Sequence, residues 1–390
     1  MTGTSVCYLD HAATAFPKAP GVLEAVRDFL DTAAGNPGRG GHRLTVEASR
    51  RIEAAREQVA ALLGGDPERT LLGPGCTFWL NTLLAGLLRP GDRVVTTALE
   101  HNAVMRPLRD LQRRRDLEVV VVRGTAPHGV PTPDEVAAAT AAAPTALVVL
   151  THASNVTGAV LPVERIAAAV VPVPVVVDGA QVGGSLPFDF ARSGLAAWTC
   201  SGHKGLLGPT GTGVLLLAPA VDLEPLVRGG TGSNSESDEM PEWLPDRLEA
   251  GTPNGAGIVG LGAACAWIAS HGVESIHARA VRLVGRLHEQ LGSIHGLRVV
   301  GRDPAGTSVG ILSFTLHGHD VGTVATVLDR EFGVMLRAGL HCAPGAHERL
   351  GTYPDGTLRI GVGPFTDEHD VDRLADGVRT IVNDKRHGST

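Results

Sequence analysis

One lysine stands out among the residues that could carry out chemistry. Only three of the 34 basic residues are lysines, namely Lys18, Lys204 and Lys385. Where a fixed positive charge is enough, this chain uses arginine, whose guanidinium stays protonated. An amine that must lose its proton and attack a carbonyl has to be a lysine. Lys204, in the Ser-Gly-His-Lys-Gly segment 201–205, is therefore a candidate Schiff-base nucleophile, and the alternative is an ordinary surface lysine in a glycine-rich loop.

A carboxylate and a glycine-bearing turn could act together with this lysine. Asp178 ends the apolar run 175–177 and has no basic neighbour in sequence, so a protonated ring nitrogen would suit it as a partner. Residues 73–77 form a turn that leads into an apolar helical face. Free backbone N–H groups and the Thr77 hydroxyl could bind a phosphate there. The alternatives are a helix-capping aspartate and an ordinary turn before a core helix.

Two further side chains could take part in catalysis. His101 follows an apolar run, and it could stack on an aromatic cofactor, move protons or serve only as a structural cap. Cys342 lies beside His341, close to Arg337 and just before the helix-like residues 346–350. Such neighbours make a thiol more reactive, and the alternative, which sequence context alone favours, is a buried structural thiol.

The first two thirds of the chain alternate short apolar runs with helical patterns. We expect strands at 93–97, 117–123, 146–151, 173–178, 197–201 and 213–218, and helices at 44–63, 133–143 and 162–170. This alternation predicts an α/β fold with a mainly parallel sheet that is buried on both faces. Ligands bind such sheets at the carboxyl ends of the strands.

The pattern changes near residue 255. From there we expect one helical stretch to about residue 291, a strand at 311–316, a helix at 320–332, strands near Val334 and Leu358, and a final helix capped by Thr366. The chain therefore divides into a large α/β domain, 21–259, and a smaller α+β domain made of 1–20 and 260–390. Residues 229–251 are rich in glycine, serine and acidic residues, and we expect a long surface loop.

Composition excludes several classes of function. The 390 residues are 43% hydrophobic and 19% charged, which is typical of a folded enzyme. The net charge of −7, without a basic stripe, argues against nucleic acid as a partner. The longest apolar stretch, 167–177, is too short for a membrane span and is interrupted by prolines. Five widely spaced cysteines indicate the cytoplasm and no metal site.

Several motifs occur in an order that resembles one family, the pyridoxal-phosphate enzymes of the class V aminotransferase fold, and within them the cysteine desulfurases. The matching segments are 8–14, 36–42, 100–102, 151–158, 178–181, 201–204, 250–254 and 337–342. The resemblance implies fold type I, in which a large domain with a central sheet binds pyridoxal 5'-phosphate and a small domain carries the catalytic cysteine.

The resemblance also implies roles for the matching residues. Lys204 would hold the cofactor as an aldimine, while Asp178 pairs with the ring nitrogen, His101 stacks on the ring and Gln181 meets the phenolic oxygen. The phosphate would be bound by Gly75, Cys76, Thr77, Ser201 and His203, with Thr252 reaching it from the other subunit of a homodimer. Asn155, Arg359 and Arg337 would position the substrate, and Cys342 would attack its sulfur.

The activity that the resemblance implies is the conversion of L-cysteine to L-alanine, with the sulfur left as a persulfide on Cys342. The short cysteine segment is similar to the family branch with a constrained loop, so a separate acceptor protein or a reductant would take the sulfur. One alternative is another enzyme of this fold, such as a C–S lyase, selenocysteine lyase, epimerase or aminotransferase, with Cys342 incidental. Another is a sulfur-carrier scaffold. A Rossmann dehydrogenase is disfavoured because no G-x-G-x-x-G opens a helix after the first strand.

Overall fold

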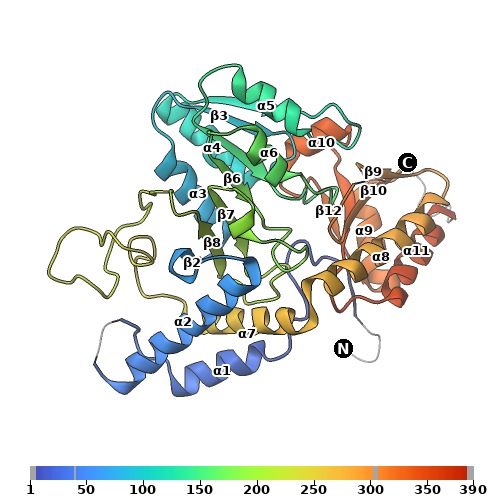
Figure 1. The fold of residues 1–390 in the computed structure, drawn as a ribbon. Coiled ribbons are helices and arrows are strands. Elements are labelled where there is room, and N and C mark those ends of the chain that lie inside the picture. Colours follow the sequence, from blue (N-terminus) through green and yellow to red (C-terminus); the bar gives the residue numbers. More distant parts are fainter. Residues whose placement is uncertain (1–5, 39–40, 302–305, 384–390) are drawn as a thin grey trace.

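The computed structural model describes residues 6–38, 41–301 and 306–383 (Figure 1). Arg39 and Gly40, which belong to one of the motifs above, and Lys385 lie outside these ranges.

A seven-stranded sheet forms the centre of the molecule, with the strand order β2-β8-β7-β6-β5-β3-β4. Its strands are β2 (Thr70–Gly73), β3 (Arg93–Thr97), β4 (Glu118–Val122), β5 (Leu147–Thr151), β6 (Val175–Asp178), β7 (Ala197–Ser201) and β8 (Gly213–Leu217). Strands β7, β6, β5, β3 and β4 run parallel, whereas β8 is antiparallel to both of its neighbours. The prediction of a mainly parallel sheet is confirmed. The sequence analysis missed β2, which pairs at the edge with β8.

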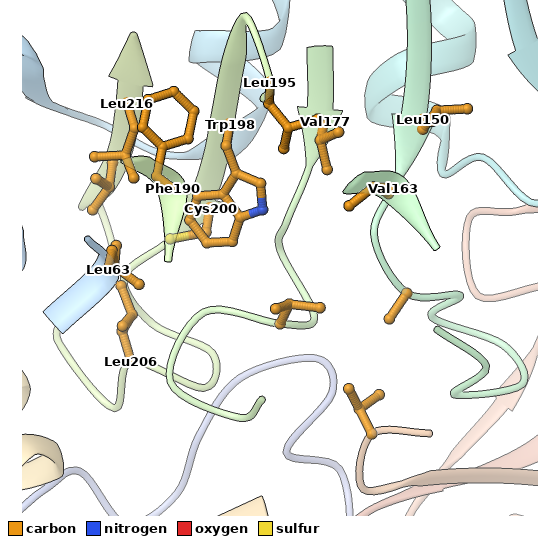
Figure 2. Close-up of a cluster of buried hydrophobic side chains, with 14 of the residues drawn as sticks. Leu63, Leu150, Val163, Val177, Phe190, Leu195, Trp198, Cys200, Leu206 and Leu216 are labelled. Atoms are coloured by element: carbon orange, nitrogen blue, oxygen red, sulfur yellow. The ribbon is translucent and has the colours of Figure 1, made fainter. Parts of the chain in front are cut away.

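Helices cover both faces of this sheet (Figure 1). They are α2 (Arg43–Leu63), α3 (Cys76–Leu87), α4 (Asn102–Arg115), α5 (Pro133–Ala141), α6 (Val163–Ala169) and α7 (Gly255–His271), and α1 (Val22–Thr32) packs against α7. Neighbouring residues of one strand belong to different apolar clusters: Val176 packs with α3 and α4, while Val175 and Val177 pack with α2, α6 and α7. This is why the inner strands are continuous apolar runs rather than alternating ones. Figure 2 shows part of the apolar cluster that contains Val175 and Val177, including Trp198 and Leu216.

A second, four-stranded antiparallel sheet follows, with the order β12-β13-β10-β9. Its elements and neighbours are α8 (Val273–Gly292), β9 (Leu297–Val300), β10 (Ile311–Leu316), α9 (Val321–Phe332), β12 (Arg337–Gly339), α10 (Pro344–Leu350), β13 (Thr357–Gly361) and α11 (Glu368–Asn383). A separate two-stranded parallel pair joins β1 (Cys7–Tyr8) to β11 (Val334–Met335). The α+β character of this part is confirmed.

Two local predictions were wrong. The single helix expected from residue 255 to 291 is two helices, α7 and α8, which bend by 78° at Gly272, a residue with a φ of 79°. Thr366 does not cap α11. Its hydroxyl accepts from the Gly363 N–H at 3.0 Å, while Asp367 and Asp370 accept from each other's backbone N–H groups at the start of the helix. The carboxylate of Asp367, one residue after Thr366, therefore caps α11.

The long connection between β8 and α7 agrees with the prediction of a surface loop. All of residues 218–254 are described, and they form turns and bends without a helix or strand. Within the described ranges, no single helix is long and apolar enough to cross a membrane. Only α7 and α8 together would reach that length and composition, across their 78° bend.

The domain boundary expected at residue 259 falls inside α7. Leu261 of α7 packs in the same apolar cluster as the central sheet, whereas Leu283 of α8 packs in the cluster of the second sheet. Near the N-terminus, Leu9 belongs to the apolar cluster of the second sheet and Ala12 to the apolar cluster of the central sheet. We propose that the chain crosses between the domains near residue 10 and again at Gly272.

Candidate functional site

A cavity of about 350 Å³ lies at the carboxyl ends of the central strands. It is where parallel strands of this kind bind ligands, since their ends leave side chains and helix N-termini facing one space. It brings together eight residues that the sequence analysis had singled out: Cys76, Thr77, His101, Asn155, Asp178, Gln181, Ser201 and Lys204.

Lys204 follows β7 by three residues and lines this cavity. Burial lowers the pKa of its ammonium, while the nearby charge of Asp178 raises it. Desolvation is the larger effect, so the amine loses its proton more easily than a lysine in water. A lysine in this state can act as a nucleophile or as a base.

Asp178 is the last residue of β6 and is 4% exposed. Its Oδ1 atom accepts from the Ala180 N–H at 2.9 Å and from the Cys76 thiol at 3.3 Å. Behind it, a Cβ on Gly179 would come within 2.0 Å of the Trp198 indole, so only glycine fits between that ring and the cavity. The carboxylate is therefore held by two donors, and the residue that follows it packs against a buried tryptophan.

The N-terminus of α3 lies at one end of the cavity and could bind an anion. Gly75, with a φ of 153°, precedes the helix, and no side chain caps this end among the described residues. A Cβ on Gly213 would come within 2.4 Å of the Gly75 Cα, so these two segments can approach closely only because residue 213 is a glycine. The backbone N–H groups at the start of α3, together with Thr77 and Ser201 in the cavity wall, suit a phosphate.

His101 caps α4, and its Nδ1 atom accepts from the Ala103 N–H at 3.0 Å. Burial is the main cause that lowers its pKa to about 4, so the ring is neutral near pH 7. The preceding residue, Glu100, links two strand ends by accepting from the Thr97 hydroxyl at 2.6 Å and from the Thr151 N–H at 3.0 Å. His101 thus presents a flat, neutral and firmly held ring to the cavity.

Gln181 and His203 are both tied to the N-terminal segment. The Gln181 side chain donates to the Ala12 carbonyl at 3.1 Å. His203 does not line the cavity; its Nδ1 atom pairs with the Thr14 hydroxyl at 3.1 Å, and its carbonyl accepts from the Ala15 N–H at 2.8 Å. These bonds place the segment that follows β1 against the Lys204 loop.

Thr252 lies apart from the cavity. It is exposed, and it lines a separate pocket of about 690 Å³ beside Trp79 and Glu249. Thr252 is not among the residues that line the cavity.

The two candidate substrate-binding arginines are cross-strand neighbours, Arg337 on β12 and Arg359 on β13. Arg359 is 2% exposed; its Nη2 atom pairs with Asp10 at 3.0 Å and its Nη1 atom donates to the Asn155 carbonyl at 3.0 Å. The Arg359 Nε atom has no hydrogen-bond partner among the described residues. Arg337 is exposed, and its charge contributes to lowering the pKa of His101.

The sequence analysis missed Asp10 as a site residue, although it lies in one of the quoted motifs. A signal was present. A buried arginine needs a carboxylate to compensate its charge, and Arg359 lies in an apolar strand without an acidic neighbour in sequence.

Cys342 is exposed, in the short connection between β12 and α10. It lines a groove of about 1190 Å³ that shares Thr77 and His101 with the cavity. His341 and Cys342 have φ values of 48° and 58°, a left-handed conformation that costs roughly 1–2 kcal/mol per residue. The Asn102 N–H fixes this turn by donating to the Cys342 carbonyl at 2.7 Å. The thiol is therefore held in a sharp turn at the edge of the site.

Comparisons with known proteins agree on one family. The family model "Aminotransferase class-V" matches residues 7–374. A probable cysteine desulfurase from Methanothermobacter thermautotrophicus is 33% identical, over 96% of this chain and 94% of that protein. The cysteine desulfurase CsdA from Escherichia coli is 32% identical, over 95% of this chain and 92% of that protein.

Solved structures give the same result. The apo structure of a cysteine desulfurase from Thermococcus onnurineus superposes with a TM-score of 0.90 at 28% identity, covering 97% of this chain and 94% of that one. The structure of CsdA from Escherichia coli superposes with a TM-score of 0.84 at 31% identity, covering 96% of this chain and 94% of that one.

Proposed function

The chain belongs to the cysteine desulfurases of the class V aminotransferase family, and on this premise we propose that it removes the sulfur of L-cysteine, leaving L-alanine and a persulfide on Cys342. One observation carries the proposal. A half-buried lysine and a buried carboxylate, Lys204 and Asp178, share one cavity, and an exposed thiol, Cys342, lies in the groove that adjoins it.

The residues present fit pyridoxal 5'-phosphate. The α3 N-terminus, where the backbone of Gly75 leaves no room for a Cβ on Gly213, would hold the phosphate, and Asp178 would hold the ring nitrogen. His101 offers a flat neutral ring for stacking, and Lys204 offers the amine that binds the aldehyde. When bound, the cofactor supplies an electron sink for the negative charge that develops on the substrate α-carbon.

Lys204 has the second task of moving a proton. With the cofactor and substrate bound, its neutral Nζ atom would take the proton from the substrate α-carbon, because burial favours the uncharged amine. The Asp178 carboxylate stays fixed by Ala180 and Cys76 during this step. Its negative charge is therefore already in place and the side chain does not have to move.

Cys342 performs the sulfur transfer. Its thiolate attacks the substrate sulfur, so that an S–S bond forms while the C–S bond breaks and its electron pair returns to the substrate carbon. Protonation of that carbon completes L-alanine. The overall change is L-cysteine plus the Cys342 thiol giving L-alanine plus the Cys342 persulfide, which balances without an external oxidant.

The substrate carboxylate is bound by Arg359, with Asn155 beside it and Arg337 near the entrance. The Arg359 Nε atom has no hydrogen-bond partner among the described residues, and the Arg359 Nη1 atom donates to the carbonyl of Asn155, which lines the cavity. A guanidinium that already neutralises Asp10 retains donors for a second carboxylate, since it carries five N–H groups.

The proposal includes a homodimer in the cytoplasm. Thr252 is exposed and outside the cavity of its own chain, so it would reach a phosphate only across a subunit interface. Five free cysteines suit a reducing compartment. The persulfide would then leave to an acceptor protein or a small thiol.

Incubation of the holoenzyme with L-cysteine and dithiothreitol, followed by identification of the carbon product, tests the function. We expect L-alanine and sulfide in equal amounts, and we expect Cys342→Ala to abolish their formation. Pyruvate with ammonia would instead identify a C–S lyase. Full turnover by Cys342→Ala would show that the thiol is incidental.

A further inference from the structure

Asn155 lies between the arginine proposed to bind the substrate carboxylate and the turn that carries Cys342. Its backbone carbonyl accepts from Nη1 of Arg359 at 3.0 Å, and its side-chain Nδ2 atom donates to the carbonyl of His341 at 2.6 Å. Asn155 is 6% exposed, so both bonds are shielded from water. One buried residue therefore contacts both parts of the site.

The turn held by Asn155 needs external contacts to keep its shape. His341 and Cys342 are consecutive residues with positive φ, and neither is a glycine. A backbone of this kind persists only where its surroundings fix it. Here the fixing bonds are those that Asn155 makes to the carbonyl of His341 and the Asn102 N–H makes to the carbonyl of Cys342, the latter at 2.7 Å.

Arg359, the other residue that Asn155 contacts, is also held in place. Asp10 holds Nη2 of Arg359 at 3.0 Å, on the strand β13. The ring of His341 packs against the same strand, with its Nε2 atom 3.1 Å from the carbonyl of Thr357 and 3.0 Å from the Thr357 hydroxyl. Arg359 and the cysteine turn are thus parts of one hydrogen-bonded framework, with Asn155 as the link whose side chain reaches across.

We propose that Asn155 is a positioning residue that couples Arg359 to the geometry of the Cys342 turn. A substrate carboxylate orders the Arg359 guanidinium, which in turn holds the Asn155 backbone, and the Asn155 amide holds the carbonyl that precedes Cys342. The thiol is then presented when the carboxylate is bound. The inference rests on the proposed function, in which Arg359 binds substrate and Cys342 accepts sulfur.

Hydrogen exchange of the holoenzyme, followed by mass spectrometry, tests the link without measuring turnover. Asn155→Asp keeps the size of the side chain but replaces the donor with a carboxylate oxygen that faces the His341 carbonyl. We expect exchange in residues 339–345 and in the first turn of α4 to accelerate by about tenfold, which corresponds to about 1.4 kcal/mol. Asn102→Ala is the matched control, because Asn102 contacts the turn through a backbone N–H that alanine retains.

The coupling itself is tested by a double-variant cycle. Arg359→Lys removes Nη1 and should also accelerate exchange in residues 339–345, although the hydrogen bonds of the Arg359 side chain go to Asn155 and Asp10. The double variant should exchange no faster than the faster single variant, because both changes remove the same link. Multiplying effects would mean that the two residues act independently, and this result would overturn the proposal, as would unchanged exchange in Asn155→Asp.

Two further measurements, exchange in α11 and alanine formation by the wild type, show which part of the proposal has failed. If exchange in α11 rises as well, Asn155→Asp has destabilised the whole fold, and the smaller uncharged variant Asn155→Ser then decides the same question. A wild-type protein that forms no alanine would refute the proposed function and leave the exchange results standing. Alanine formation with unchanged exchange would refute only the coupling.

Discussion

The thiol of Cys76 donates a hydrogen bond to Oδ1 of Asp178 across 3.3 Å, in the wall of the cavity. Burial is the main cause that raises the pKa of this thiol, and the charge of Asp178 adds to it. Cys76 therefore stays protonated as a donor, and it is not a second nucleophile beside Cys342.

The contrast between the cysteines predicts a labelling result. Burial raises the pKa of Cys7 and of Cys265 to about 12, and Cys76 and Cys200 are buried as well, whereas Cys342 is exposed. We expect iodoacetamide at pH 7.5 to modify one cysteine per native chain, identified as Cys342 by mass spectrometry. All five should react in guanidinium chloride. Rapid labelling of Cys76 in the native protein would contradict the role given to its thiol.

Replacement of Lys204 separates charge from nucleophilicity. Lys204→Arg keeps a positive charge near Asp178 but cannot bind an aldehyde covalently. We expect the absorbance of the covalently bound cofactor to disappear and the rate of alanine formation to fall by more than about 10²-fold. Lys18→Arg is the matched control. Lys18 bonds the carbonyl of His203 from outside the cavity, and this change should preserve the covalent absorbance.

Gly179 is predicted to be irreplaceable for steric reasons. A Cβ at this position would lie 2.0 Å from the Trp198 indole, so Gly179→Ala must displace either the ring or the Asp178 backbone. We expect a loss of about 1–3 kcal/mol in the free energy of unfolding, measured in urea, together with weaker cofactor retention.

The matched control for Gly179 is Gly285→Ala. Gly285 lies inside α8 with no atom within 4 Å of an added Cβ, and alanine there should stabilise the helix by about 0.5–1 kcal/mol. Equal effects at the two positions would show that contact with Trp198 is not the cause.

Stability should fall as the pH is lowered, and His152 gives a defined reason. Its Nδ1 atom accepts from the Trp198 indole N–H at 3.2 Å, and burial lowers its pKa from 6.5 to about 3. Between these two values the unfolded chain binds a proton that the native chain excludes, so this contribution is complete above pH 6.5 and is lost towards pH 3. At pH 5 the loss is about 2 kcal/mol.

Urea unfolding at pH 5 and pH 7.5 measures this dependence. His152→Gln keeps an acceptor but does not titrate, so we expect its stability to change less between the two pH values than that of the wild type. A variant with the same pH dependence as the wild type would assign the effect to other groups.

The amino-acid sequence by itself determined the chemistry and the class of the fold. A single mid-chain lysine, a carboxylate at the end of an apolar run, and runs too continuously apolar for a surface sheet were enough to predict Lys204, Asp178 and a buried parallel sheet. These features are local: each depends on residue type and on the character of a few neighbours. Strands β3, β7 and β10 were predicted to the residue for the same reason.

Contacts between distant segments were decided by the tertiary structure. The pair of Asp10 with Arg359, the Cys76 thiol on Asp178 and the Asn155 amide on His341 join residues that are 349, 102 and 186 positions apart. The break between α7 and α8 is of the same kind. Gly272 could have continued a helix at a modest cost, but the two halves pack in different apolar clusters, and burying both stabilises the fold by more than one unbroken helix would.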